Sequence, residues 1–406
     1  MKLAYIDSLP VGGGLSRYSL GLCKNLLRYD ETIQIDYYIH SDNASKMKEL
    51  FGLDRLNVYV LKSTLPTNKY FFFLNKILTK VFKFNLEKSI DKEISQNVDD
   101  RYDVVYFPSA HMMPFPNLAV PIVSTMHDFN WKYFFGSQIF SDTFCATMEI
   151  EIPKWLSKSN VITLSHATLD ECKKLFPNLA SYPEVIPVGA LTVYSDMTRE
   201  RSSQILAEKS IKFPYILYPA NLFPHKNHLN LYTAFSILKR NPTYKEYKLL
   251  LTGADTDKIG FGKAEYRGLL NISLPADDHS NYDVIGLGYT TNEFMDALII
   301  GAELLISSSI YEEMCQPAMD AWMFGTPTVL SDIPPFREHE QNIGVKSAYF
   351  DPMNPNDIAN TLHYCLSNTD EMYQNALVSR EKIKKYTWEN VCSSYLNVFR
   401  KAIVNK

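Results

Sequence analysis

The sequence predicts an α/β protein built from two doubly wound parallel sheets. Three observations lead to this prediction: the chain has 406 residues, too many for one ordinary core, short apolar segments recur along it, and stretches of helical periodicity separate them. Buried parallel strands are typically short apolar runs connected by helices. The alternation is present in both halves of the chain, which indicates one sheet in each half.

In the first half, the predicted elements begin with a strand over Lys2–Asp7 and a helical pattern over Leu15–Leu27. Each later strand is a short apolar run bounded by polar or turn-forming residues, as strands of a parallel sheet usually are. These further strands are Ile33–His40, Val58–Lys62, Val104–Pro108, Ile122–Met126 and Val161–Ser165.

The second half repeats this order, with predicted helices over Leu229–Leu238 and Trp388–Val404 and another that opens near Pro317 and ends at Gly325. Proline suits a first helical turn because its missing N–H is not needed there, and glycine suits a helix end. The predicted strands of this half are Tyr215–Tyr218, Lys248–Thr252, Val284–Leu287, Leu304–Ser307 and Thr328–Ser331.

The domain boundary is expected in the polar stretch Leu191–Phe213, which separates the two strand-rich halves. We place the first domain at residues 1–192 and the second at residues 193–387. Polar stretches with few apolar residues are typical of the segments that connect domains.

Composition excludes several classes of protein. A net charge of −4 and a pI near 6.2 argue against nucleic acid as a main partner. The six cysteines are scattered without a C-x-x-C pair, which is typical of a reduced, cytoplasmic protein. The sequence shows no signal-peptide character and no apolar run near the roughly 20 residues of a spanning helix, so we expect any membrane contact to be peripheral.

The segment from Ala302 to Glu338 carries the strongest functional signal. An apolar strand is followed by a loop with Glu312 and Glu313, then by a helix that contains Asp320 about one turn from its start. Free N–H groups and the dipole at a helix start bind phosphate, and carboxylates accept hydrogen bonds from sugar hydroxyls. Ligands bind at the carboxyl ends of parallel strands, so this segment predicts a site for a nucleotide sugar.

Three further places offer groups for the same site. Lys226 precedes a predicted helix, where a cation meets phosphate oxygens. Gly12–Gly14 follow the first strand, and glycine lets the backbone approach a ligand; the run is not G-x-G-x-x-G, so a dinucleotide site is not predicted. His127 ends a strand and can donate or accept a hydrogen bond near neutral pH. The alternatives are a solvated lysine, a tight turn and a structural histidine.

Ser309–Pro317 resembles the signature of the retaining GT-B glycosyltransferases of the large family four, Ser-x-x-Glu-Gly-Phe-Gly-x-Pro with a second acid eight residues after the first. The resemblance implies that Glu312 contacts the transferred sugar and Asp320 the ribose. The chain departs from the pattern where Glu313 and Cys315 replace the two loop glycines, and where the second acid is Asp. The donor-binding residues implied in this segment are Met314, Cys315, Gln316 and Asp320.

The glycine run is similar to the Gly-Gly-x-x-Arg-Tyr loop of these enzymes, which implies that Gly14 lies near the donor phosphate. Gly13 and Arg17 would then face the acceptor. The pair His127-Asp128 resembles a family His-Asp pair: His127 would lie beside the donor sugar, and Asp128 would either orient it or bind the acceptor.

The run Pro-His-Lys-Asn-His that ends at His228 resembles one subgroup of the family and places Lys226 on the donor diphosphate. Asn221 stands where the family commonly has arginine, so His225 or Arg17 would supply further positive charge. Asn221 and His225 are therefore expected donor contacts. The strand containing Ile285 resembles the one whose backbone meets the nucleobase.

Together these resemblances imply a GT-B fold, two Rossmann-like domains facing across a cleft, with the terminal helix at residues 388–406 packed back on the first domain. The implied enzyme is a retaining, metal-independent hexosyltransferase with catalytic residues Glu312, His127 and Lys226. It would move a sugar, with mannose and rhamnose suggested by the subgroup, from a nucleotide diphosphate sugar to a glycan or lipid-linked glycan in surface polysaccharide biosynthesis. No cofactor is expected besides the donor. The alternatives are a non-catalytic nucleotide-binding subunit and a sugar-nucleotide epimerase.

Two other motifs have competing interpretations. Asp255-Thr256-Asp257 is an Asp-x-Asp triplet, which holds a divalent metal in GT-A enzymes, but its position favours a surface turn, and no metal site is expected. Lys69–Lys92 predicts a basic amphipathic helix, which could lie on the anionic inner face of a membrane or pack on the core with its lysines outward.

Overall fold

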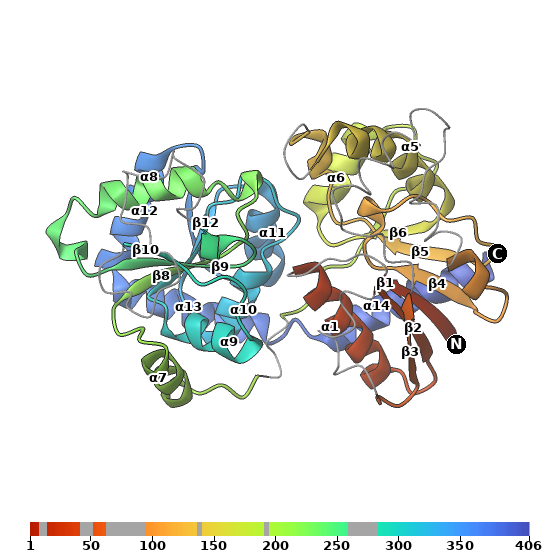
Figure 1. Cartoon of the computed structure of the whole chain (residues 1–406), viewed down its shortest axis with the longest axis horizontal. Coiled ribbons are helices and arrows are strands. Elements are labelled where there is room, and N and C mark those ends of the chain that lie inside the picture. Colours follow the sequence, from red (N-terminus) through yellow and green to blue (C-terminus); the bar gives the residue numbers. More distant parts are fainter. Residues whose placement is uncertain are drawn as a thin grey trace.

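The computed structural model describes residues 1–7, 14–40, 52–61, 94–135, 140–190, 195–258 and 283–405. Within these residues the chain forms two parallel sheets, each packed with helices, in two units that lie side by side (Figure 1). The amino-terminal unit holds the first sheet and the carboxyl-terminal unit the second. The predicted α/β architecture with one parallel sheet in each half is confirmed.

The first sheet has the strand order β3-β2-β1-β4-β5-β6-β7, and its paired strands are parallel. The order reverses between β1 and β4, which makes the carboxyl ends of these neighbours a place for ligands. The strands are β1 (Lys2–Asp7), β2 (Gln34–His40), β3 (Leu56–Leu61), β4 (Val104–Phe107), β5 (Ile122–Thr125), β6 (Asn160–Thr163) and β7 (Glu184–Val185). The longer helices of this unit are α1 (Gly14–Tyr29), α5 (Asp142–Lys158) and α6 (His166–Leu175).

The second sheet has the order β10-β9-β8-β11-β12-β13 and reverses between β8 and β11. Its strands are β8 (Tyr215–Pro219), β9 (Lys248–Thr252), β10 (Val284–Gly286), β11 (Leu304–Ser307), β12 (Thr328–Ser331) and β13 (Ala348–Phe350). The helices are α7 (Arg199–Glu208), α8 (His228–Leu238), α9 (Asn292–Gly301), α10 (Gln316–Phe324), α11 (Pro334–Ile343), α12 (Pro355–Ser367) and α13 (Thr369–Ile383).

The last helix, α14 (Trp388–Val404), leaves the second unit and packs on the first (Figure 1). Its apolar face enters the first core: Tyr395 and Phe399 are fully buried in the same cluster as Leu3 and Tyr106. Trp388 Nε1 donates to the carbonyl of Ala190 at 2.9 Å, which fixes the start of the helix. The chain therefore passes between the units twice.

The stretch in which the domain boundary was expected contains a helix that was not predicted. The stretch Leu191–Phe213 is not a linker throughout, because it contains α7, whose N-cap is Thr198. Only Ser202, Ile205 and Leu206 of this helix are buried, and the rest is polar, so its apolar periodicity is too weak to show in the sequence.

The two ambiguous motifs have different outcomes. Asp255 pairs with Lys258 at 2.6 Å on the surface, and both side chains are more than half exposed. Among the described residues, no group of His, Cys, Asp or Glu side chains is placed to hold a metal ion. The Lys69–Lys92 segment and Gly12–Gly13 lie outside the described residues. No helix in the described part of the chain combines the length and the apolar character needed to cross a membrane.

Candidate functional site

The predicted site residues come together where loops after the strands of both sheets meet. In the second sheet, β8 and β11 are neighbours at the reversal of strand order, and the loops that follow them carry Lys226 and Glu312. Lys226 Nζ and Glu312 Oε1 form an ion pair, with less than a fifth of either side chain exposed. The sequence places both groups at the position in the fold where an open α/β sheet binds its ligand.

The loop at residues 308–315 has the predicted local structure. Strand β11 ends at Ser307, and helix α10 begins at Gln316 with Pro317 in its first turn. The helix ends at Gly325, whose φ of 77° is left-handed and suits glycine. Cys315 lies in the N-cap position and its side chain makes no capping hydrogen bond. Gln316 is half-buried in the first turn, and Met314 packs against the cores of both units.

Asn227 occupies the N-cap position of α8, but its side chain bonds elsewhere. It has a left-handed backbone with φ 57°, and its side chain makes no capping hydrogen bond to α8. Its Nδ2 instead donates to the carbonyls of Ser308 at 3.1 Å and Pro352 at 2.7 Å. Asn227 thus ties the Lys226 loop to the loop that carries Glu312, which holds the ion pair in place.

Arg17 and Asp320 form a second ion pair, which joins the two units. Arg17 Nη2, on α1, lies 3.1 Å from Asp320 Oδ2, on α10. The Asp320 side chain is fully buried, and about a third of the Arg17 side chain is exposed. A buried carboxylate needs such a cation, so Arg17 satisfies Asp320 in the ligand-free protein.

His127 and Glu313 form a third pair, also across the units. His127 follows β5, and its Nδ1 lies 2.8 Å from Glu313 Oε2. Its Nε2 lies 2.7 Å from the carbonyl oxygen of Pro108, and Glu313 Oε1 accepts from the backbone N–H of Leu164 at 3.2 Å. Both ring nitrogens therefore have protein partners. The sequence marked Glu313 only as the replacement of a glycine and did not reveal this contact, because its partners come from the other half of the chain.

The surroundings of His127 contain two aromatic residues that sequence reasoning missed. The rings of Tyr18 and His111 lie edge-on to it, with centroids 5.0 and 5.1 Å away. Burial and the neighbouring His127 hold the pKa of His111 well below its usual range, so this ring is neutral. Nothing local distinguishes His111, which lies in the turn after β4.

The pKa values of Asp128 and His225 are shifted in opposite directions. Burial, together with the carboxylates of Glu313 and Glu312, raises the pKa of Asp128 to about 7, although Asn130 donates a backbone hydrogen bond to it. Burial and the adjacent Lys226 lower the pKa of His225 to about 2. His225 is therefore neutral. The sequence led us to expect further positive charge from either His225 or Arg17, and a neutral His225 does not supply it.

The remaining predicted contacts have different surroundings. Asn221 follows β8, and its Oδ1 has no hydrogen-bond partner among the described residues. Ile285 is fully buried in β10, so its side chain does not face a ligand. At Gly14, the first residue of α1, an added Cβ would meet nothing within 4 Å. Gly13 lies outside the described residues.

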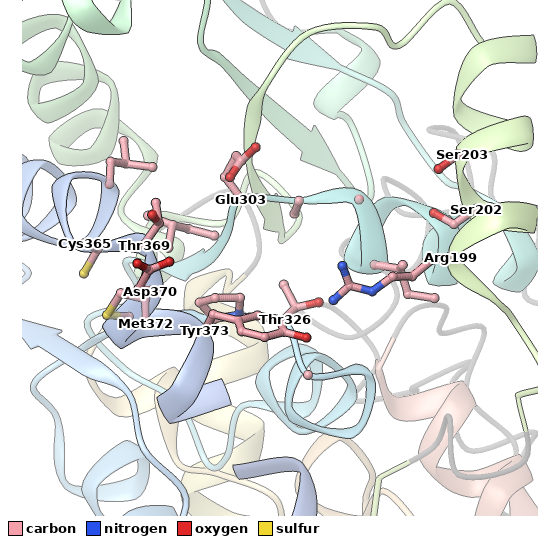
Figure 2. Close-up of a pocket in the computed structure, with 17 residues that line it drawn as sticks. Arg199, Ser202, Ser203, Glu303, Thr326, Cys365, Thr369, Asp370, Met372 and Tyr373 are labelled. Carbon is pink, nitrogen blue, oxygen red and sulfur yellow. The ribbon is translucent and has the colours of Figure 1, made fainter. Parts of the chain in front are cut away.

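A cavity of about 420 Å³ lies at the amino-terminal ends of the strands of the second sheet, where β11 begins (Figure 2). Its lining mixes the cation of Arg199 with the acids Glu303 and Asp370, and Arg199 extends over the ring of Tyr373 with 5.7 Å to the centroid. None of the predicted site residues lines it. This cavity is therefore separate from the loops at the carboxyl ends of the strands.

Comparison with known proteins gives a fold for the chain and a family match for part of it. Residues 199–386 match the family described as glycosyl transferases group 1. The uncharacterized glycosyltransferase MJ1607 of Methanocaldococcus jannaschii is 23% identical over 99% of each chain. The O-antigen chain mannosyltransferase B of Escherichia coli is also 23% identical, over 59% of this chain and 60% of that protein.

Solved structures agree over the whole length. The crystal structure of Anabaena Alr3699/HepE in complex with UDP and glucose has a TM-score of 0.71 at 14% identity, covering 99% of this chain and 100% of that one. The lipopolysaccharide glycosyltransferase WaaG has a TM-score of 0.69 at 11% identity, covering 98% and 99%. At these identities the likeness establishes the fold, and the predicted GT-B fold is confirmed.

Proposed function

We propose that this chain transfers a hexose from a nucleotide diphosphate sugar to a hydroxyl of a glycan or lipid-linked glycan. The transfer would retain the configuration at the sugar and need no metal. The proposal starts from the match of residues 199–386 to the group 1 glycosyl transferases and from the GT-B fold. The observation that carries the proposal is the Lys226–Glu312 pair at the reversal of strand order between β8 and β11. A cation beside a carboxylate offers one group to a diphosphate and one to a sugar.

The mechanism follows from exchanging these partners. When the donor binds, the ion pair between Lys226 and Glu312 breaks. The Lys226 ammonium then contacts diphosphate oxygens, and the Glu312 carboxylate accepts a hydrogen bond from a sugar hydroxyl. The bond from the sugar C1 to the diphosphate then breaks while the acceptor oxygen bonds to C1 on the same face. The acceptor proton passes to the leaving diphosphate. Lys226 stabilises the charge that grows on that leaving group, which is the interaction that lowers the barrier.

A structural neighbour and a sequence relative support the donor class. Alr3699/HepE is a structural neighbour whose crystals hold UDP and glucose, and UDP-glucose in another crystal. The mannosyltransferase relative favours mannose among the candidate sugars, with rhamnose as the second. We place the reaction in surface polysaccharide assembly, at the cytoplasmic face of a membrane where a lipid-linked acceptor would lie.

A ligand screen tests the proposal. GDP-, UDP- and dTDP-sugars are each added at millimolar concentration, and the melting temperature is recorded, since a ligand that binds only the native protein raises it. The donor that stabilises the protein is then assayed for hydrolysis and for transfer to membrane glycolipid extracts. We expect one base to be preferred and transfer to follow. Stabilisation without any turnover would favour the non-catalytic subunit, and interconversion of the donor sugar without an acceptor would favour the epimerase.

A further inference from the structure

We propose that Glu313 is a positioning residue of this site, which holds His127 as an imidazolium with one proton on each ring nitrogen. The inference rests on the geometry of the contact between the two units, and its consequence for catalysis rests on the function proposed above.

The first step concerns Nε2 of His127. It lies 2.7 Å from the carbonyl oxygen of Pro108, which can only accept a hydrogen bond. Nε2 must therefore carry a proton. A neutral imidazole has one N–H, so this bond fixes the tautomer and leaves Nδ1 with a lone pair unless the ring is charged.

The second step concerns Nδ1, which lies 2.8 Å from Glu313 Oε2. A lone pair facing a carboxylate oxygen at that distance would repel it, so a proton must lie between them. The carboxylate also accepts from the Leu164 N–H through its other oxygen. Burial raises the pKa of the Glu313 carboxyl above its usual value, while His127 and the Leu164 N–H act in the opposite direction. Because both carboxylate oxygens face N–H donors, which favour the ionised form, we assign the shared proton to the ring.

Burial strengthens the pair. His127 and Glu313 are each less than a tenth exposed, and charges at close range interact more strongly where water is excluded. Burial opposes the charging of the ring, but the Glu313 carboxylate and the two hydrogen bonds outweigh it and raise the pKa of His127 above its usual value. In the part of the chain that the structure describes, the other titratable or charged groups near this pair are Tyr18, His111, Asp128, Glu312 and Tyr395.

The consequence is that the side chains beside the donor have a fixed orientation and fixed hydrogen-bonding groups. The ring cannot rotate without breaking both hydrogen bonds, and it offers no lone pair to a sugar hydroxyl. Each oxygen of the Glu313 carboxylate retains a lone pair, so the carboxylate can accept a hydrogen bond from a sugar hydroxyl. The arrangement exists only while the two units are in contact, because His127 and Glu313 come from different units.

The matched control is Glu338→Gln. Glu338, on α11, also bridges the units: it accepts from the backbone N–H groups of His166 at 2.8 Å and Ala167 at 3.0 Å. Its loss weakens the contact between the units without touching His127. An effect of Glu313→Gln that Glu338→Gln does not reproduce is therefore an effect on His127.

The first experiment uses ligand-free protein with ¹⁵N-labelled histidine, and the signals of His127 among the nine histidines are assigned with His127→Phe. At pH 7.5 we expect both nitrogens of His127 to be protonated in the wild type and in Glu338→Gln. In Glu313→Gln we expect only Nε2 to keep its proton, since the opposite charge is gone. A neutral His127 in the wild type, or an unchanged spectrum in Glu313→Gln, overturns the proposal. This result does not depend on activity, so it stands apart from the proposed function.

The second experiment follows kcat/KM against pH with the donor found by the screen. The alkaline limb should move to lower pH by about one unit or more in Glu313→Gln, and Glu313→Asp should restore part of the wild-type profile. A purely structural role would scale the whole profile without moving it, and that outcome contradicts the proposal. If Glu313→Gln does not fold, the wild-type spectrum and Glu313→Asp still decide.

Discussion

At the scale of single residues, the site is neutralised by its own side chains. Each of three carboxylates has a cationic partner: Glu312 has Lys226, Asp320 has Arg17 and Glu313 has His127. Under the proposed function, a diphosphate or a sugar hydroxyl exchanges with these partners in order to bind. Charged groups in a water-poor site remain hydrogen-bonded throughout such an exchange, which avoids the cost of an unpaired buried charge.

Replacing Lys226 by alanine should lower kcat by roughly a hundredfold or more, because a preorganised charge on the leaving group is lost. Glu312→Ala should have an effect of the same order. The measurement is turnover at saturating donor. The control is Lys258→Ala, which removes an exposed lysine paired only with Asp255 among the described residues. Turnover near that of the wild type in Lys226→Ala would contradict the assigned role.

Replacing Arg17 by alanine should destabilise the protein by about 1–2 kcal/mol, because it leaves the carboxylate of Asp320 buried without its cation. The partly exposed Arg17 side chain keeps the effect below that of a fully buried pair. Thermal unfolding of Arg17→Ala, Asp320→Asn and the double variant measures the coupling. Strictly additive losses would show that the pair contributes nothing.

At the scale of elements, close contacts between backbones explain why some glycines are needed. An added Cβ at Gly286, at the end of β10, would lie 1.8 Å from the carbonyl oxygen of Thr256. The strand that is expected to meet the nucleobase is therefore packed directly on the turn η6 (Thr256–Lys258).

Gly286→Ala should cost about 3 kcal/mol, since a backbone atom must move to admit the methyl group. Gly14→Ala is the contrasting variant: its methyl group has open space, and a helical alanine should stabilise by about 0.4–1 kcal/mol. Melting temperatures check both. If Gly14 lies near the donor phosphate, the Gly14 variant should still lose activity. Equal stability of the two variants would refute the packing argument.

Helix α14 gives a second prediction at this scale. Trp388 is buried at its first turn with its indole N–H bonded to Ala190, so Trp388→Ala should cost about 3–5 kcal/mol. Val404, at the other end, is 82% exposed, and Val404→Ala should stay within about 0.5 kcal/mol of the wild type. Thermal unfolding measures both. A small loss for Trp388→Ala would mean that the helix does not stabilise the first unit.

At the scale of the whole molecule, the sequence revealed what depends on local pattern. Buried strands such as Leu304–Ser307 and helix signals such as Pro317 and Gly325 are written in consecutive residues, and they were predicted correctly. The largely polar helix α7 was missed for lack of an apolar stripe. The partnership of Glu313 with His127 joins residues 186 positions apart, which no local pattern can disclose.

The contact between the units should depend on pH. The raised pKa of His127 means that its pair with Glu313 contributes fully below the ordinary histidine value of roughly 6.5 and is lost as pH rises through the folded value. The difference in melting temperature between the wild type and Glu313→Gln should therefore be larger at pH 6.5 than at pH 9. Other titrations largely cancel in this difference. A gap that stays constant or widens toward pH 9 would contradict the assignment.

The return of α14 to the first unit has a consequence for biosynthesis. Tyr395 and Phe399 complete the core that Leu3 and Tyr106 begin, yet the ribosome makes them only after the entire second unit has been synthesised. We therefore expect the apolar residues of the first unit that α14 covers to stay exposed on the nascent chain until the second unit has been synthesised. We expect chaperones to engage the chain during that interval, and a stop codon ahead of Trp388 to yield a product that proteases remove.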